Sequence, residues 1–218
     1  MSEEELHWIT ITPVMRQVLL TFSTTAIGEH FYLAGGTALA LQLGHRQSID
    51  LDFFSFDQDI PAITSPLKGA LGKFGPVLAD SSWGNLVFVA DGVRVGFYGY
   101  GFSLVKPILQ TDGIKLASIM DIGLMKLDAL LSRASRKDFH DLYAICRNIP
   151  LRTMLDLAPE KYPYVRDFEA QVVRHLVYFE RAERETPVPL IDEVPWETVK
   201  EWFKSQALSI SQGWLTNG

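Results

Sequence analysis

The 218-residue sequence has little of several features that define other protein classes. Its one cysteine, Cys146, cannot form an internal disulfide or a multi-cysteine zinc site. No apolar run approaches the roughly 20 residues that a membrane-spanning helix needs, and there is no internal repeat or low-complexity tract. We therefore expect a cytoplasmic protein that does not cross a membrane.

Basic charge is also scarce. Twenty Lys and Arg residues stand against 26 Asp and Glu residues, so the net charge is −6, which disfavours non-specific binding to nucleic acid. The segment from Lys126 to Arg152 is an exception, with six basic and three acidic residues. Such a local cluster could hold the phosphates of one ligand, although a solvated helix face gives the same pattern.

The residues that are present predict an α+β fold. Apolar residues make up 47% of the chain, enough for a packed core. Apolar runs and turn signals predict strands over 31–34, 49–56 and 114–117, a hairpin of 85–90 with 93–98, and helices over 13–26 and 37–43. From Ser118 the spacing becomes helical, with helices over 118–131, 137–147, 164–185 and 196–210. We expect a mixed β-sheet core flanked by helices over 1–117, followed by a helical C-terminal region over 118–218.

Gly35 and Gly36 stand between a predicted strand and a predicted helix. Two glycines let backbone amides approach a ligand closely, and a helix N-terminus adds partial positive charge. Together with Thr37 they are candidates for a phosphate cradle. An ordinary tight turn explains the two glycines equally well.

Asp50 and Asp52 are more informative. Residues two apart on a strand point to the same face, and two adjacent carboxylates repel each other unless a cation lies between them. Mg²⁺ or Mn²⁺ would suit this pair and leave positions open for substrate phosphates. A half-exposed edge strand with a polar face is the alternative. Arg46 and Ser48, just before the strand, are further candidates for phosphate contacts.

A second group of charged residues follows in the helical region. Lys126 and Arg133 are seven residues apart and share a helix face, and so do Asp138 and Asp141 at a spacing of three. With Lys137, the cations could hold triphosphate oxygens or stabilise developing charge. Charges that complement the dipoles of two consecutive helices would give the same pattern.

Two blocks of sequence carry a combined signature. The first comprises LAGGTALAL over 33–41, GHR over 44–46 and SIDLDFF over 48–54; the second comprises MKLDALLSR over 125–133 and KDFHDLY over 137–143. In this order and at this distance, the blocks resemble the AbiEii/AbiGii nucleotidyltransferase-like toxin family. The resemblance implies a core like that of polymerase β, and a toxin component of a toxin–antitoxin or abortive-infection system.

The resemblance also implies a reaction and a set of site residues. Members are expected to move a nucleotide from a nucleoside triphosphate with Mg²⁺ to an RNA acceptor such as tRNA, or to a protein, and to have a cognate antitoxin. Carried over by position, Gly35, Gly36 and Thr37 would contact phosphates, with Ser48 nearby. Asp50 and Asp52 would hold the metal, Lys126 would contact the nucleotide, and Asp138 or Asp141 would complete the site.

The sequence departs from this pattern at one place. A nucleotidyltransferase site usually has a third carboxylate on a neighbouring strand, and the matching strand, 93–98, contains no acid. A catalytically silent nucleotide-binding module that acts through a protein partner therefore stays open as an alternative. Transfer of the γ-phosphate, as in a kinase, would use the same phosphate cradle and is a third possibility.

Overall fold

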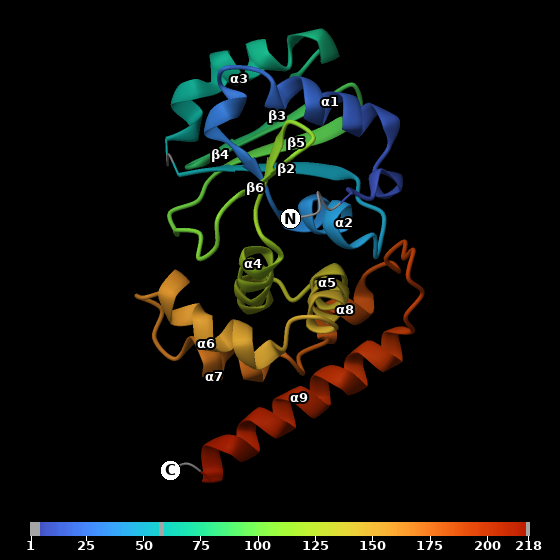
Figure 1. Ribbon diagram of the computed structural model, residues 1–218, viewed down its shortest axis with the longest axis vertical. Coiled ribbons are helices and arrows are strands. Elements are labelled where there is room, and N and C mark those ends of the chain that lie inside the picture. Colours follow the sequence, from blue (N-terminus) through green and yellow to red (C-terminus); the bar gives the residue numbers. More distant parts are fainter. Residues whose placement is uncertain (1–4, 57–58, 217–218) are drawn as a thin grey trace. The chain divides into compact units, whose positions relative to one another are not determined.

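The computed structural model describes residues 5–56 and 59–216 (Figure 1). Positions 1–4, 57–58 and 217–218 of the two expected regions lie outside the described residues. Contacts within the chain divide it into an N-terminal unit, Met1–Ser118, and a C-terminal unit, Ile119–Gly218. Every described strand lies in the first unit, and α4 to α9 lie in the second. The predicted α+β class, a mixed sheet followed by a helical region, is confirmed.

The N-terminal unit is built on a seven-stranded mixed sheet in the order β3-β4-β5-β2-β1-β7-β6. The strands are β1 (Tyr32–Leu33), β2 (Asp50–Ser55), β3 (Val77–Ser82), β4 (Asn85–Ala90), β5 (Val93–Gly99), β6 (Leu109–Thr111) and β7 (Ile114–Leu116). The predicted hairpin is β4 and β5, joined at Asp91–Gly92. β2 runs antiparallel to β1 and parallel to β5, so it is a central strand rather than an edge.

Alternation along β2 and β5 gives this sheet two different faces. Leu51 and Phe53 are buried, whereas Asp50, Asp52 and Phe54 are partly exposed. The buried face packs on α1 (Pro13–Ser23): the ring of Phe22 lies 4.5 Å from that of Phe53 and 5.1 Å from that of Phe97. The core therefore fills one face of these strands and leaves the two aspartates on the other.

Short signals in the sequence set the helices of this unit. Thr12 caps α1, since its hydroxyl oxygen accepts from the Met15 amide at 3.2 Å. α2 (Gly35–Leu43) ends at Gly44, which adopts φ +68°. α3 (Thr64–Ala70) lies along the same side of the sheet as α1 (Figure 1). Single 3₁₀ turns complete the unit: η1 (Trp8–Thr10), η2 (Gly28–His30), η3 (Ile60–Ile63) and η4 (Gly72–Phe74).

The C-terminal unit consists of α4 (Ile119–Ser132), α5 (Arg136–Cys146), α6 (Leu151–Lys161), α7 (Phe168–His175), α8 (Glu180–Arg184) and α9 (Trp196–Thr216). α4 packs against α5, α6 and α7. A cluster of aromatic rings joins α5 to the later segments, because Phe139 lies within 6 Å of Phe179, Trp196 and Phe203. None of the described helices has both the length and the apolar character needed to cross a bilayer.

Some predicted elements are wrong or were missed. The single helix over 164–185 is in fact α7 and α8, separated by residues 176–179, and the break lets Phe179 turn into the aromatic cluster. α6, β3 and β6 were not predicted. α9 extends past the predicted end at residue 210 to Thr216, and α1 ends three residues before the predicted 26.

Candidate active site

The two aspartates of β2 are the starting point of the site. Asp50 and Asp52 lie on the face of the strand opposite to α1, and the Asp52 side chain is 27% exposed. Among the described residues, no cluster of three or more His, Cys, Asp and Glu side chains forms a complete metal site. Two carboxylates suit Mg²⁺, which is commonly bound by one or two carboxylates, water and substrate phosphates. The donor set therefore fits a divalent cation that arrives with a phosphorylated substrate.

The N-terminus of α2 lies beside Asp52. Gly35 begins this helix with φ +67°, and a Cβ atom at that position would stand 3.2 Å from Asp52 Oδ2. The backbone thus approaches the carboxylate at a place where a side chain would crowd it. A Cβ atom on Gly36 would instead overlap the guanidinium of Arg46. The expected Gly-Gly turn, Arg46 and the aspartates are consequently neighbours in space.

Thr37 and Ser48 connect α2 to β2. The Thr37 hydroxyl bonds to Ser48 Oγ at 2.7 Å and donates to the backbone carbonyl of Asp50. Both side chains are almost fully buried, with 1% of Thr37 and 8% of Ser48 exposed. These bonds fix the start of α2 relative to the aspartate strand. Gly35 and Gly36 supply the backbone amides there.

The strand beside Asp50 and Asp52 is β5. In this parallel pairing Asp50 is opposite Arg94, and Asp52 is opposite Gly96. Arg94 Nη1 lies 3.9 Å from Asp52 Oδ1. A Cβ atom on Gly96 would overlap the ring and hydroxyl of Tyr98, so Tyr98 folds back over this glycine. The neighbouring strand therefore carries a cation and a phenol, with no acid at positions 93–99.

Tyr98 also belongs to the electrostatics of this face. Burial raises the pKa of Tyr98, and the Asp52 carboxylate raises it further, while Arg94 opposes the change. The phenol therefore keeps its proton and is a hydrogen-bond donor beside Asp52. Its ring stacks on Phe54 with centroids 5.1 Å apart, which continues the same face with an aromatic surface.

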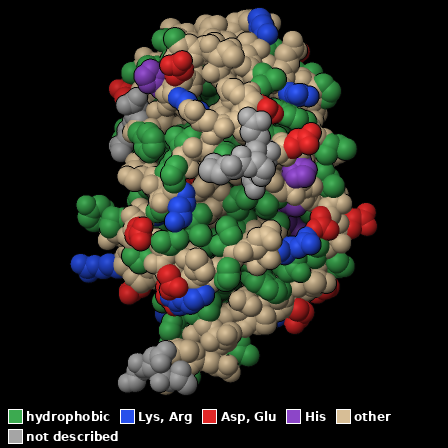
Figure 2. All heavy atoms as spheres, in the orientation of Figure 1, with side chains coloured by type: hydrophobic (Ala, Val, Ile, Leu, Met, Phe, Trp, Pro, Cys, Tyr) green, Lys and Arg blue, Asp and Glu red, His purple; other side chains and the backbone are tan. Residues whose placement is uncertain are grey.

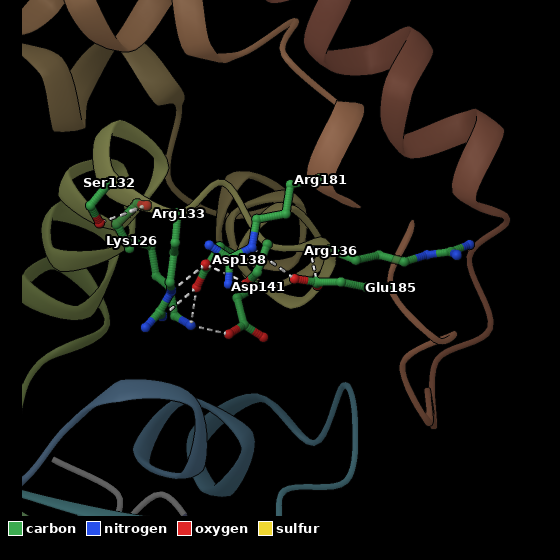
Figure 3. A network of polar contacts seen from close by, with 10 residues as sticks. Lys126, Ser132, Arg133, Arg136, Asp138, Asp141, Arg181 and Glu185 are labelled. Carbon is green, nitrogen blue, oxygen red and sulfur yellow. Dashed lines mark hydrogen bonds and ion pairs between the residues drawn. The ribbon is translucent and has the colours of Figure 1, made fainter. Parts of the chain in front are cut away.

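The second predicted group forms a polar network inside the C-terminal unit (Figure 3). Lys126 Nζ donates to Asp138 Oδ1 at 2.9 Å and lies 2.6 Å from Asp141 Oδ2. Arg133 binds Asp138 through two hydrogen bonds, both of 2.8 Å. Ser135 adds a donor to Asp138 at 2.5 Å. The structure therefore brings four of the five predicted charged residues into one cluster.

Burial determines the charge state of this network. Asp138 and Asp141 are fully buried, and Lys126 is 5% exposed. Burial alone would raise the pKa of Asp138, but Lys126, Arg133 and Ser135 together hold it below its ordinary value. The fifth residue, Lys137, is exposed on α5. Arg133 is 44% exposed, so its guanidinium lies at the surface of the network.

Reasoning from the sequence missed three parts of these clusters. Arg94 and Tyr98 are ordinary members of a predicted hairpin, and only the pairing of β2 with β5 places them beside the aspartates. No sequence pattern around Ser135 indicated that its hydroxyl binds Asp138. A second buried ion pair, Lys161 with Asp121 at 3.0 Å, was also missed. Because α6 was not predicted, nothing indicated that Lys161 lies at the end of a helix.

Comparisons with known proteins identify the class to which this sheet and its Asp-x-Asp strand belong. Residues 17–82, which contain both glycines and both aspartates, match the model of the nucleotidyl transferase AbiEii toxin family of type IV toxin–antitoxin systems. An uncharacterized protein of Aquifex aeolicus, aq_aa25, is 37% identical over 194 residues, covering 87% of this chain and 92% of the relative.

A solved structure shares the fold. An H. pylori protein described as a candidate nucleotidyltransferase superposes with a TM-score of 0.56 at 19% identity, covering 94% of this chain and 95% of the other. The chain belongs to the AbiEii nucleotidyl transferase toxin family. The resemblance to this family is thereby confirmed, with the first block, 33–54, inside the matched residues, and so is the nucleotidyltransferase type of fold.

Proposed function

We propose that this protein transfers a nucleotide from a nucleoside triphosphate to a hydroxyl group of an RNA, with Asp50 and Asp52 holding a Mg²⁺ or Mn²⁺ ion. The observation that carries this proposal is the position of Asp52. Its carboxylate shares one strand face with that of Asp50 and lies next to the N-terminus of α2. The carboxylates that we assign to the metal and the helix end that we assign to phosphate are thus adjacent, which suits nucleotidyl transfer.

The residues of the N-terminal unit have separate roles in this proposal. The bound ion would neutralise charge on the triphosphate and polarise its α-phosphate. The amides of Gly35 and Gly36 bind phosphate oxygens, and Arg46, packed against Gly36, adds positive charge there. Thr37 and Ser48 hold α2 against β2 and so position those amides.

The second signature contributes residues of the C-terminal unit. Asp138 and Asp141 hold the buried Lys126 ammonium, which we assign to the nucleotide together with the exposed Arg133 and Lys137. The reaction needs only the nucleoside triphosphate and the acceptor hydroxyl as reactants. The acceptor oxygen bonds to the α-phosphorus, the bond from that phosphorus to the bridging oxygen breaks, and pyrophosphate leaves. The hydroxyl proton passes to solvent.

The family supports a toxin that acts with an antitoxin partner. Proteins of this family belong to type IV toxin–antitoxin systems, so we propose a cognate antitoxin and a cytoplasmic site of action. For the acceptor we propose the end of a tRNA. Lys, Arg, Asp and Glu side chains are interspersed on the face drawn in Figure 2, and the net charge is −6. A local contact near residues 126–152 therefore suits RNA better than broad electrostatic attraction.

One observation favours a second candidate function. β5 lies directly beside the aspartates and has no acid at positions 93–99, so a third carboxylate on that strand is missing. A nucleotide-binding module that acts through a protein partner needs no such group. It would be stabilised by a nucleoside triphosphate without forming a product.

Radioactive label distinguishes these functions. The purified protein is incubated with Mg²⁺, bacterial RNA and each of the four nucleoside triphosphates, labelled in parallel at the α- or the γ-phosphate. Nucleotidyl transfer places α-label, and no γ-label, on RNA. Transfer of γ-label would instead show a kinase-like reaction. A nucleotide-dependent rise in melting temperature with neither label transferred would favour the binding module.

A further inference from the structure

Arg94 occupies an unusual position for a basic residue. It lies on β5 opposite Asp50, and its guanidinium is 3.9 Å from the Asp52 carboxylate. Gly96, the next residue on this face, has no side chain, and Tyr98 folds back over it toward the same carboxylate. The place beside the two aspartates is thus filled by a cation that a phenol holds in position.

The contact between Arg94 and Asp52 is a loose one. Elsewhere in the protein, buried Asp138 receives two parallel hydrogen bonds of 2.8 Å from Arg133. Arg94 approaches Asp52 only to 3.9 Å, and its side chain is 47% exposed. A guanidinium has five donors in a planar fork, and this one is not closed on a carboxylate. At 3.9 Å, the Asp52 carboxylate does not take up the donors of this fork, which stay available to a second anion.

From this geometry we infer that Arg94 binds the triphosphate of the incoming nucleotide, an assignment that rests on the function proposed above. Without ligand, Arg94 offsets the repulsion between Asp50 and Asp52. A divalent cation held by the two aspartates would take over that task, and the guanidinium would then be available to the strongly anionic triphosphate. Guanidinium and phosphate match in shape and charge, and form paired hydrogen bonds.

The test measures binding, so it does not depend on turnover. Isothermal titration calorimetry on the full chain, at saturating Mg²⁺, gives the affinity for inorganic triphosphate and for each nucleoside triphosphate. Arg94→Ala should weaken both by about 10- to 100-fold, the range for a lost hydrogen bond to a charged group. Arg94→Lys, which keeps the charge and loses the fork, should fall between. Arg16→Ala is the matched control, because Arg16 lies on α1, on the other face of the sheet from the aspartates, and packs on Trp8. The triphosphate affinity of this variant should stay within about twofold of wild type.

Each result decides a separate point. Equal affinity of Arg94→Ala and wild type for inorganic triphosphate would overturn the assignment, and so would the absence of triphosphate binding in wild type. If Arg94→Ala weakened the binding of single-stranded RNA and left triphosphate binding unchanged, the assignment would also be overturned, and Arg94 would instead bind the RNA acceptor. If wild type transfers no α-label but its triphosphate affinity depends on Arg94, the assignment stands and the proposed transfer fails. Arg94→Lys keeps the test valid if Arg94→Ala does not fold.

Discussion

Asp52 on β2 is paired in register with Gly96 on the parallel strand β5, and the ring of Tyr98 lies over this glycine. The absence of a side chain at Gly96 is what lets the Tyr98 side chain lie there, beside the Asp52 carboxylate. One glycine on the neighbouring strand therefore determines which side chains surround a proposed metal ligand.

This relationship predicts the effect of Gly96→Ala. The new methyl group would overlap the Tyr98 ring, so Tyr98 must leave Asp52 and Arg94. We expect a loss of about 1–3 kcal/mol in unfolding free energy, as for other overpacked sites, and weaker triphosphate binding. Urea unfolding and calorimetry measure the two effects. Gly69→Ala is the control, because a Cβ atom there meets nothing within 4 Å; an equal loss in both variants would contradict this account.

Gly35→Ala tests the helix end beside the aspartates. Gly35 has φ +67°, a left-handed conformation that costs other residues about 1–2 kcal/mol, and the added methyl would crowd Asp52. We expect a stability loss of that size and a loss of α-label transfer larger than the stability change explains. Unfolding in urea and the transfer assay, run on the same preparation, measure both. Full transfer activity in Gly35→Ala would exclude a close approach of this backbone to the phosphates.

The network of the C-terminal unit predicts how stability depends on pH. The pKa of Asp138 is lower in the folded protein than its ordinary value of 3.8, so folding favours the carboxylate. The stabilisation is complete well above pH 4 and is lost as acid protonates Asp138 in the folded state. Asp138→Asn should cost about 2–3 kcal/mol at pH 7, and its difference from wild type should shrink as the pH falls below about 4.

Urea unfolding at a series of pH values tests this prediction. Asp156→Asn is the control, because Asp156 pairs with Arg152 at the surface and its side chain is 59% exposed. Exposed pairs contribute about 0–1 kcal/mol. A cost for Asp138→Asn that is the same at pH 3 and pH 7 would show that its charge does not stabilise the fold.

Cys146 gives a simple probe of the C-terminal unit. Burial raises the pKa of its thiol to about 12, so at pH 8 only about one thiol in ten thousand is the reactive thiolate. Iodoacetamide should therefore modify native protein at least about 100-fold more slowly than protein unfolded in urea. Mass spectrometry follows the reaction. Equally fast modification of both forms would mean that α5 does not bury this residue.

Local patterns account for the parts that the sequence predicted. The β4–β5 hairpin follows from an Asp-Gly turn between two apolar runs, and β2 follows from the alternation of Asp50 and Asp52 with apolar neighbours. The Thr12 cap and the Gly44 stop have equally local causes. These features depend on residues close together in the chain, which is why pattern and spacing are enough to find them.

Contacts between distant residues account for what was missed. Nothing near Arg94 indicates that β5 runs parallel to β2 with Arg94 opposite Asp50. Every residue of β3 is exposed, so this strand has no apolar alternation to find. α6 was missed because Pro150 stands at its N-cap and Pro159 lies inside it, and prolines usually indicate the end of a helix. The break between α7 and α8 has no proline or glycine, and instead serves the packing of Phe179 on Phe139 and Trp196.

The most direct test of the central claim is transfer of α-³²P from nucleoside triphosphates to bacterial RNA, with wild type beside the Asp50→Ala, Asp52→Ala double variant and the Arg16→Ala control. Circular dichroism first shows that all three are folded. We expect label on RNA with wild type and Arg16→Ala, and none with the double variant. Equal labelling by the double variant, or no labelling by folded wild type with any of the four nucleotides, would contradict a nucleotidyltransferase site at Asp50 and Asp52.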